Sequence, residues 1–140
     1  MVRRTRRLHD SDYDRLLAFR DGLRRFIHWS EDQAKSVGLT GSQHQLLLAI
    51  RGHGSQPSVR DVASHLLLRH HSAVELVDRA VAAGLVARMG DPDDQRIVRL
   101  GLTEAGEAKV RALAAAHLEE LSRLRPQFES LWDRLPEPAN

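Results

Sequence analysis

The side chains best suited to chemistry in this chain cluster between residues 58 and 102, where arginines, histidines and hydroxyls recur. A guanidinium group carries a permanent charge and several N–H donors, so it suits phosphate oxygens and the acceptor edges of bases. Serine, histidine and glutamate add hydrogen bonds whose strength depends on the base they meet. Such a set is typical of surfaces that contact duplex nucleic acid. The candidate contacts are Arg60, Arg69, His70, His71, Ser72, Glu75, Arg79, Arg88 and Arg96.

Two short helices joined by a turn are predicted to carry most of these side chains. Ser58 and Asp61 have the spacing of a capping box, which marks the start of the first helix. The second helix is predicted to begin within residues 70–72 and to end before Gly84, because glycine readily adopts the left-handed conformation found after helix C-termini. The apolar residues predicted on its buried face are Val74, Val77 and Val81.

A charged β-hairpin is predicted directly after the second helix. Residues 90–94 are turn formers, and apolar residues then alternate along the returning strand at Val98, Leu100 and Leu102. Arg96 lies at the hairpin tip, where it could enter a minor groove or stay solvated, and the preceding helices favour the groove. A helix-turn-helix followed by such a hairpin is a winged helix, a shape suited to reading duplex DNA.

Acidic residues within the same region have competing interpretations. Glu75 could accept a hydrogen bond from a cytosine amino group, or it could pair with Arg79 four residues later on the helix. Asp94 is unfavourable beside phosphate, so we interpret it as structural, either orienting Arg96 or capping the turn. Between residues 58 and 102 the chain has six arginines and six acidic residues. DNA binding would therefore depend on where these charges point.

Long helices are predicted on both sides of the winged helix. Apolar residues repeat at helical spacing from Asp12 to Val37, and again in a helix that Thr103 can cap. Thr40 and Gln43 form a capping-box pair for the helix that follows the first one. Pro126 is predicted to lie in the first turn of a short last helix. Because the first and last helices are too apolar to stand alone beside a small lobe, we expect them to interleave with a second copy.

Five segments form one pattern of consistent order and spacing: Gly38-Leu39-Thr40 with Gln43 and Leu46-Leu47, then Leu76-Val77-Asp78-Arg79, Gly84-Leu85-Val86-Ala87-Arg88, Asp91-Pro92-Asp93-Asp94-Gln95-Arg96, and Leu100-Gly101-Leu102-Thr103-Glu104-Ala105-Gly106. This pattern resembles the MarR family of winged-helix transcriptional regulators, named for multiple antibiotic resistance. The resemblance extends from about Phe19 to Leu121. Glu75 stands where many members of the family carry a basic or hydroxyl residue.

The resemblance implies one domain over residues 1–140, mainly α with a small β-hairpin wing: a winged helix-turn-helix with long terminal dimerisation helices. The winged DNA-binding lobe would span about residues 40–102, and the dimerisation helices about residues 12–37 and 103–135. The function implied is that of a homodimeric repressor that binds a pseudo-palindromic operator in double-stranded DNA and releases it when a small molecule binds.

The resemblance also implies a ligand site between the dimerisation helices and the winged lobe. A small aromatic or phenolic ligand would bind near His28 and Trp29, with His44 as a third candidate. Trp29 could equally be an aromatic side chain of the dimer core.

Composition narrows the function classes further. The chain has 21 Lys and Arg against 19 Asp and Glu, so its net charge does not indicate a nucleic-acid partner. The N-terminal segment is locally basic, however, with Arg3, Arg4, Arg6 and Arg7. The chain contains no Cys, which excludes a thiol redox switch within these residues. No apolar run approaches the ~20 residues of a membrane span. We therefore expect a cytoplasmic protein without a membrane partner.

Other classes of function find less support in the residues. The chain has eight histidines, which are common metal ligands. Because His65, His70 and His71 lack the usual ligand spacing, no metal or other cofactor is expected. No nucleophile elbow, phosphate loop or paired-carboxylate motif is present, so an enzyme is not expected. The alternative to a regulator is a DNA-architectural or protein-interaction module without small-molecule control.

Overall fold

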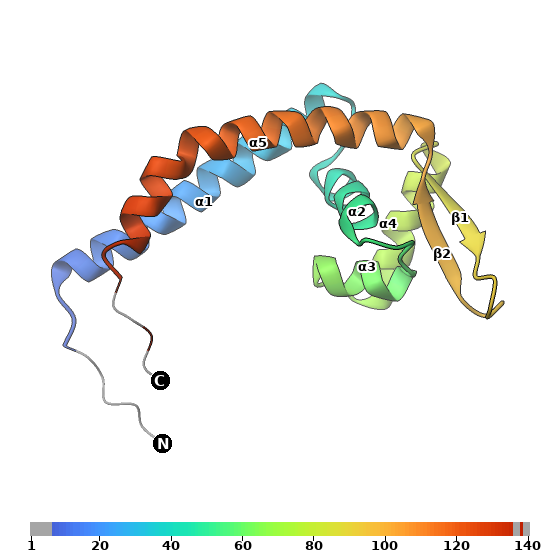
Figure 1. Cartoon of the computed structure of the whole chain (residues 1–140), viewed down its shortest axis with the longest axis horizontal. Helices are drawn as coiled ribbons and strands as arrows, with labels where there is room; N and C mark the ends of the chain where they lie inside the picture. Colours follow the sequence, from blue (N-terminus) through green and yellow to red (C-terminus); the bar gives the residue numbers. More distant parts are fainter. Residues whose placement is uncertain (1–6, 136–137, 139–140) are drawn as a thin grey trace, which may run out of the picture.

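The computed structural model describes residues 7–135 and residue 138, so Arg3, Arg4 and Arg6 of the basic N-terminal segment lie outside the described residues. In chain order the elements are α1 (Asp10–Ser36), α2 (Gly41–Gly52), α3 (Val59–Leu66), α4 (His70–Ala82), β1 (Val86–Gly90), β2 (Val98–Leu102) and α5 (Glu104–Trp132). The predicted mainly helical fold with one small hairpin is confirmed. Figure 1 shows α1 and α5 side by side as a curved arm, with α2, α3, α4 and the hairpin gathered as a winged lobe at one end.

Local hydrogen bonds start the helices where the sequence predicts. The Thr40 hydroxyl accepts from the Gln43 backbone N–H at 3.1 Å, and the Gln43 side chain accepts from the Thr40 N–H at 3.0 Å. Ser58 and Asp61 form the same reciprocal pair at the start of α3. The Thr103 hydroxyl accepts from the Gly106 N–H at 3.1 Å. Each bond satisfies a backbone donor that lacks an intrahelical partner, so the predicted helix starts are confirmed.

The turn between α3 and α4 contains an unusual backbone conformation. Leu67 has a φ of 54°, the left-handed region, and is the single non-glycine residue of the described chain with a positive φ. The turn after α4 instead uses Gly84, with a φ of 74°, as predicted.

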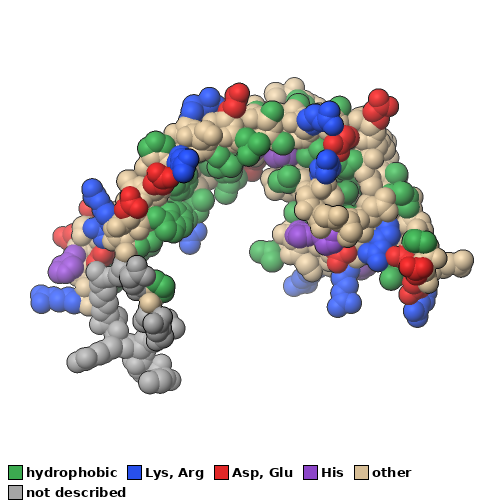
Figure 2. Space-filling view, in the orientation of Figure 1, with side chains coloured by type: hydrophobic (Ala, Val, Ile, Leu, Met, Phe, Trp, Pro, Cys, Tyr) green, Lys and Arg blue, Asp and Glu red, His purple; other side chains and the backbone are tan. Residues whose placement is uncertain are grey.

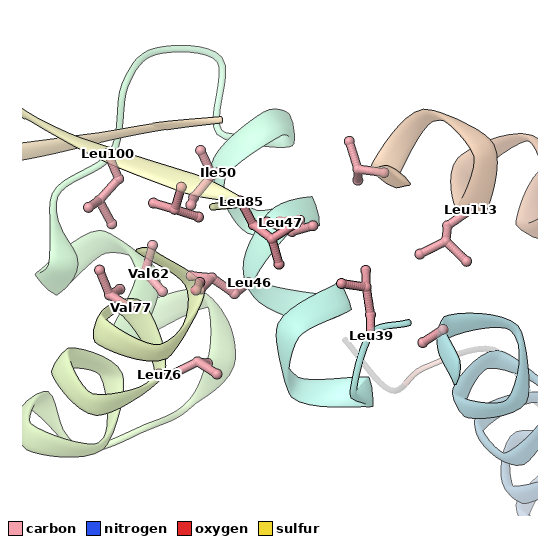
Figure 3. Packing of buried hydrophobic residues seen from close by; sticks show 14 residues of the cluster. Leu39, Leu46, Leu47, Ile50, Val62, Leu76, Val77, Leu85, Leu100 and Leu113 are labelled. Atoms are coloured by element: carbon pink, nitrogen blue, oxygen red, sulfur yellow. The ribbon is translucent and has the colours of Figure 1, made fainter. Parts of the chain in front are cut away.

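The hydrophobic core lies in the winged lobe and continues into the arm (Figure 3). Its largest fully buried side chains include Leu46 and Leu47 of α2, Val62 of α3, Val77 of α4 and Leu100 of β2. Residues that join the arm to this core are Ala34 of α1 and Val110 and Leu113 of α5. Burial of side chains from every element of the lobe fixes α4 against α3.

The buried face of α4 lies about one residue earlier in the chain than the sequence predicted. Val77 is fully buried, but Val74 and Val81 are only half-buried. The residues that α4 buries are Ala73, Leu76, Val77 and Ala80. Counted from Ala73, the other three follow at positions i+3, i+4 and i+7, which lie on one face of a helix. Val74 and Val81 lie at the edge of this face.

The wing is held by hydrogen bonds on both sides of β2. β1 and β2 pair antiparallel, with Val86 opposite Leu102 and Gly90 opposite Val98. On its other side β2 meets the segment before α3, where the Leu100 N–H donates to the Pro57 carbonyl at 2.8 Å. The wing therefore has a fixed base on the same segment that begins the helix-turn-helix.

The prediction of a separate last helix beginning at Pro126 was wrong, because α5 continues through this residue to Trp132. A proline inside a helix removes one backbone hydrogen bond, but contacts on the far side of it can offset that loss. Phe128 and Trp132 both pack edge-on against Phe19 of α1, with ring centroids 6.2 and 5.5 Å apart. Among the described helices, none combines the length and hydropathy that a bilayer-crossing segment needs.

Candidate nucleic-acid interface

Three arginines of the winged lobe are exposed and have no ion pair within the described residues. Figure 2 shows Lys and Arg side chains on the part of this lobe that points away from the arm. Arg60 of α3, Arg69 before α4 and Arg79 of α4 are exposed, and none of them forms an ion pair within the described residues. Their charges are therefore free to meet an external anion.

The N-terminal end of α4 lies open beside Arg69. Arg69 is its N-cap residue and makes no side-chain capping bond, so the first backbone N–H groups of the helix lack that partner. His70 and His71 are exposed and Ser72 is half-buried. A helix N-terminus attracts anions through these N–H groups and the helix dipole. Backbone and side-chain donors are thus combined at one place.

Glu75 and Arg79 do not pair with each other within the described residues, although the helix places them four residues apart. Glu75 is exposed on the same helix as Arg79. Of the two interpretations of Glu75, the intrahelical ion pair is not formed in this structure.

At the wing tip, Asp94 orients Arg96. One carboxylate oxygen of Asp94 accepts from the backbone N–H and the Nε of Arg96 at 3.0 and 3.1 Å, and the other accepts from Nη2 at 3.0 Å. The Arg96 side chain is nevertheless 89% exposed. Hydrogen bonds from Arg96 lower the pKa of Asp94, which keeps the carboxylate charged. The structural interpretation of Asp94 is confirmed: it orients an arginine that projects into solvent.

Two further arginines of this region are occupied inside the lobe. Arg88 of β1 pairs with Asp78 of α4, which ties the wing to the candidate recognition helix. Arg99 of β2 donates to the Asp91 carboxylate at 2.8 Å. These two arginines are held by acids of the lobe, whereas Arg60, Arg69 and Arg79 have no ion pair within the described residues. Composition does not reveal which arginines are paired and which are left without a partner.

The ligand candidates separate into two places. Trp29 and His44 both lie against His117 of α5, with ring centroids 4.8 Å away in each case. His28 is instead exposed and lies 3.5 Å from Asp32 on the same helix. Ser30 completes the group, since its hydroxyl lies 2.7 Å from Nε2 of His117.

His117 and Ser30 are residues that sequence reasoning did not single out. His117 Nδ1 lies 2.7 Å from the Leu113 carbonyl, so the neutral ring donates there and its Nε2 accepts from Ser30. One signal was present in the sequence: His117 stands midway between Leu113 and Leu121 at helical spacing, a polar residue inside an apolar stripe. His44 is 3% exposed, and burial, followed by the nearby His117, lowers its pKa.

A cleft of about 620 Å³ lies next to this group, between the arm and the winged lobe. Its lining residues are Phe26, Ile27, Ser30, Glu31, Lys35, Gly41, Ser42, Gln45, Leu66, Leu68 and Leu76. The walls are largely apolar, and Lys35 and Glu31 supply charges of opposite sign. Ser30 belongs both to the cleft and to the His117 group, whereas His28, Trp29 and His44 are not among the lining residues.

Known proteins share sequence with the winged lobe that carries the candidate DNA contacts. Residues 37–97 match the family model described as MarR family. The winged lobe of this chain is therefore similar in sequence to the MarR family. The repressor MdtR of Bacillus subtilis (strain 168) is 27% identical over 92 residues, 66% of this chain and 59% of MdtR. The match thus spans less than two thirds of that relative's length.

Solved structures of MarR proteins share the fold. The MarR family transcription regulator SP03579 superposes with a TM-score of 0.75 at 24% identity, covering 87% of this chain and 80% of that one. A mutant of Staphylococcus aureus MepR bound to an oligodeoxyribonucleotide gives a TM-score of 0.62 at 21% identity, covering 89% and 85%. The MarR family match contains every candidate DNA contact, from Arg60 to Arg96, but not Trp29 or His117.

Proposed function

We propose that this chain is a sequence-specific DNA-binding transcriptional repressor that acts as a homodimer on a pseudo-palindromic operator. The observation that carries the proposal is the pairing pattern of the winged lobe. Arg60, Arg69 and Arg79 are exposed without ion pairs, while Asp94 directs Arg96 outward from the wing. The relative MdtR is named as a repressor, and the MepR structure contains DNA, which supports the same assignment.

Each element has a distinct role in this proposal. The N-terminal part of α4 enters the major groove, where His70, His71 and Ser72 meet base edges or phosphates and Glu75 accepts from a cytosine amino group. Arg96 enters the adjacent minor groove. The cations that neutralise phosphates are Arg60, Arg69 and Arg79. Arg88 contributes indirectly, because its partner is Asp78 on α4.

A second copy of the chain is the occupant proposed for the apolar surface of the arm. Large apolar side chains on this surface are exposed in one copy: Tyr13, Leu16, Leu17, Leu118, Leu121, Trp132 and Leu135. A contiguous apolar surface of this kind is typical of an interface, and two-fold dimers are the commonest assembly. Two lobes related by a two-fold axis would read half-sites about 34 Å apart.

A small aromatic or phenolic acid is the proposed effector. The cleft between arm and lobe offers the apolar walls of Phe26, Ile27 and Leu68 and the cation of Lys35, which together suit an aromatic carboxylate. Because α1 and α2 both line the cleft, a bound ligand would change the angle between arm and lobe, and with it the spacing of the two recognition helices. A repressor of this kind has no catalytic role, and because it acts on chromosomal DNA it would work in the cytoplasm.

Selection of bound duplexes from a random pool tests the function. A repressor enriches an imperfect palindrome and protects it in a footprint, and candidate phenolic acids lower the affinity for that site. Broad protection without an enriched sequence would instead indicate a DNA-architectural module. Failure to retain any duplex at moderate salt would contradict DNA binding itself.

A further inference from the structure

We propose that Arg99 is the positioning residue of the wing: it sets where Arg96 stands relative to α3 and α4 without contacting DNA itself. This inference rests on the proposed function, since Arg96 must meet DNA for its position to matter. The role is separate from that of the candidate contacts, because the guanidinium of Arg99 is held by Asp91, Asp61 and the Gln56 carbonyl.

Arg99 joins three parts of the lobe. Its Nε donates to Oδ2 of Asp91, in the wing loop, at 2.8 Å. Its Nη1 lies 3.8 Å from the Asp61 carboxylate of α3 and 3.5 Å from the backbone carbonyl of Gln56. Its own backbone forms a β-bridge with Ser58, the N-cap residue of α3. One side chain therefore connects the wing loop to the start of the helix-turn-helix.

The link continues from Asp91 to the wing tip. The second carboxylate oxygen of Asp91 accepts from the backbone N–H groups of Asp93 and Asp94, at 2.8 and 2.9 Å. Asp94 in turn holds Arg96 through three hydrogen bonds. The order of contacts is thus Arg99, Asp91, Asp94 and Arg96, and each step is a hydrogen bond to a carboxylate.

Burial and charge separate the roles of Arg99 and Arg96. The Arg99 side chain is 29% exposed, and the carboxylate of Asp91 that it contacts is 12% exposed. The Arg96 side chain is 89% exposed. Hydrogen bonds from Arg99 lower the pKa of Asp91, so this carboxylate stays charged and the link persists across the physiological pH range. A guanidinium suits the position because its planar donors reach partners on different sides, which a lysine ammonium cannot match.

A pair of acid-to-amide substitutions separates positioning from net charge. Asp91→Asn weakens the acceptor for Arg99 and adds one positive charge, whereas Asp93→Asn adds the same charge in the same loop and leaves the Asp91 carboxylate intact. If positioning governs, Asp91→Asn lowers the affinity for the selected operator duplex about 5- to 150-fold, the range expected for losing an arginine contact, and Asp93→Asn does not. If Asp91→Asn binds as tightly as Asp93→Asn, the proposal is overturned.

A double-mutant cycle tests whether Arg99 acts through Arg96. Affinities at matched salt are compared for the full chain and for Arg96→Ala, Arg99→Gln and the double variant, by fluorescence anisotropy on one duplex. Positioning predicts that Arg99→Gln weakens binding and that the double variant binds about as well as Arg96→Ala alone. Additive losses, or no loss from Arg99→Gln, would show that Arg99 does not work through Arg96.

A measurement without DNA keeps this inference distinct from the proposed function. Backbone ¹⁵N relaxation of the free protein measures the order parameters of residues 94–96, which fall as the backbone becomes more mobile. We expect Asp91→Asn and Arg99→Gln to lower that order and Asp93→Asn to leave it unchanged; unchanged order in the first two variants contradicts the link. If the wild-type chain retains no duplex while these order changes are present, the proposed function fails and the mechanical link stands.

Discussion

The imidazole rings of His44 and His117 pack against each other with centroids 4.8 Å apart, where α2 of the winged lobe meets α5 of the arm. Ser30 of α1 holds His117 in place at 2.7 Å, so all three helices meet at this pair. His44 Nδ1 is buried and has no hydrogen-bond partner within the described residues. The contact is therefore stable only while the rings do not both carry charge.

Stability is expected to fall as the pH drops through about 6.5. Burial, and then the neighbouring His117, lowers the pKa of His44 below its ordinary value of 6.5. On acidification the unfolded chain takes up a proton at His44 before the folded chain does, which favours unfolding until the lower, folded-state pKa is passed. Urea unfolding at pH 7.5 and pH 5.5 measures the loss. His44→Phe removes this titration and should reduce the difference between the two pH values; an unchanged difference would assign it to other groups.

Removal of the wing arginine should weaken DNA binding. Arg96→Ala is expected to cost about 1–3 kcal/mol of binding free energy to the selected duplex, because Arg96 projects from the wing toward the proposed minor groove. Anisotropy titrations at one salt concentration measure the change. Arg24→Ala is the matched control, since it removes the same charge from an exposed position on α1. Equal effects of the two substitutions would indicate that only net charge matters.

A charge placed in the apolar surface of the arm should separate the proposed dimer. Leu118 is 66% exposed in one copy, and Leu118→Asp would bury a carboxylate at the interface, so we expect a folded monomer by sedimentation. Leu48→Asp is the control, because Leu48 is 46% exposed on α2 of the winged lobe and lies outside the proposed interface. A Leu118→Asp protein that remains dimeric at the same concentration would place the interface elsewhere.

Close packing at the start of α5 predicts a large effect of one methyl group. A Cβ on Gly106 would overlap the backbone carbonyl of Leu85, which is itself held by the Thr103 N–H at 3.1 Å. Gly106→Ala should therefore lower the free energy of unfolding by about 1–3 kcal/mol. Gly52→Ala, at a helical glycine with open space around it, is the control and should be neutral or stabilising. Thermal unfolding of both variants decides whether the carbonyl can move.

Features that depend on neighbours in the sequence could be predicted from it. The helix starts at Thr40, Ser58 and Thr103 follow from side chains that bond backbone groups three residues away. Gly84 ends α4 for a reason equally local, its freedom at positive φ. The left-handed Leu67 shows the limit, since leucine has no intrinsic preference for the left-handed conformation that it adopts as the C-cap residue of α3.

Features that depend on distant contacts were decided by the tertiary structure. α5 passes through Pro126 because Phe128 and Trp132 pack on Phe19, more than 100 residues earlier in the chain. Arg60, Arg69 and Arg79 stay unpaired while Arg88 and Arg99 contact acids of the lobe, and composition counts these charges without pairing them. His117 joins His44 and Ser30 because three helices cross at one point, 87 residues separating Ser30 from His117. Spacing along a chain sets which local bonds can form, but which groups meet across it depends on how the buried faces pack.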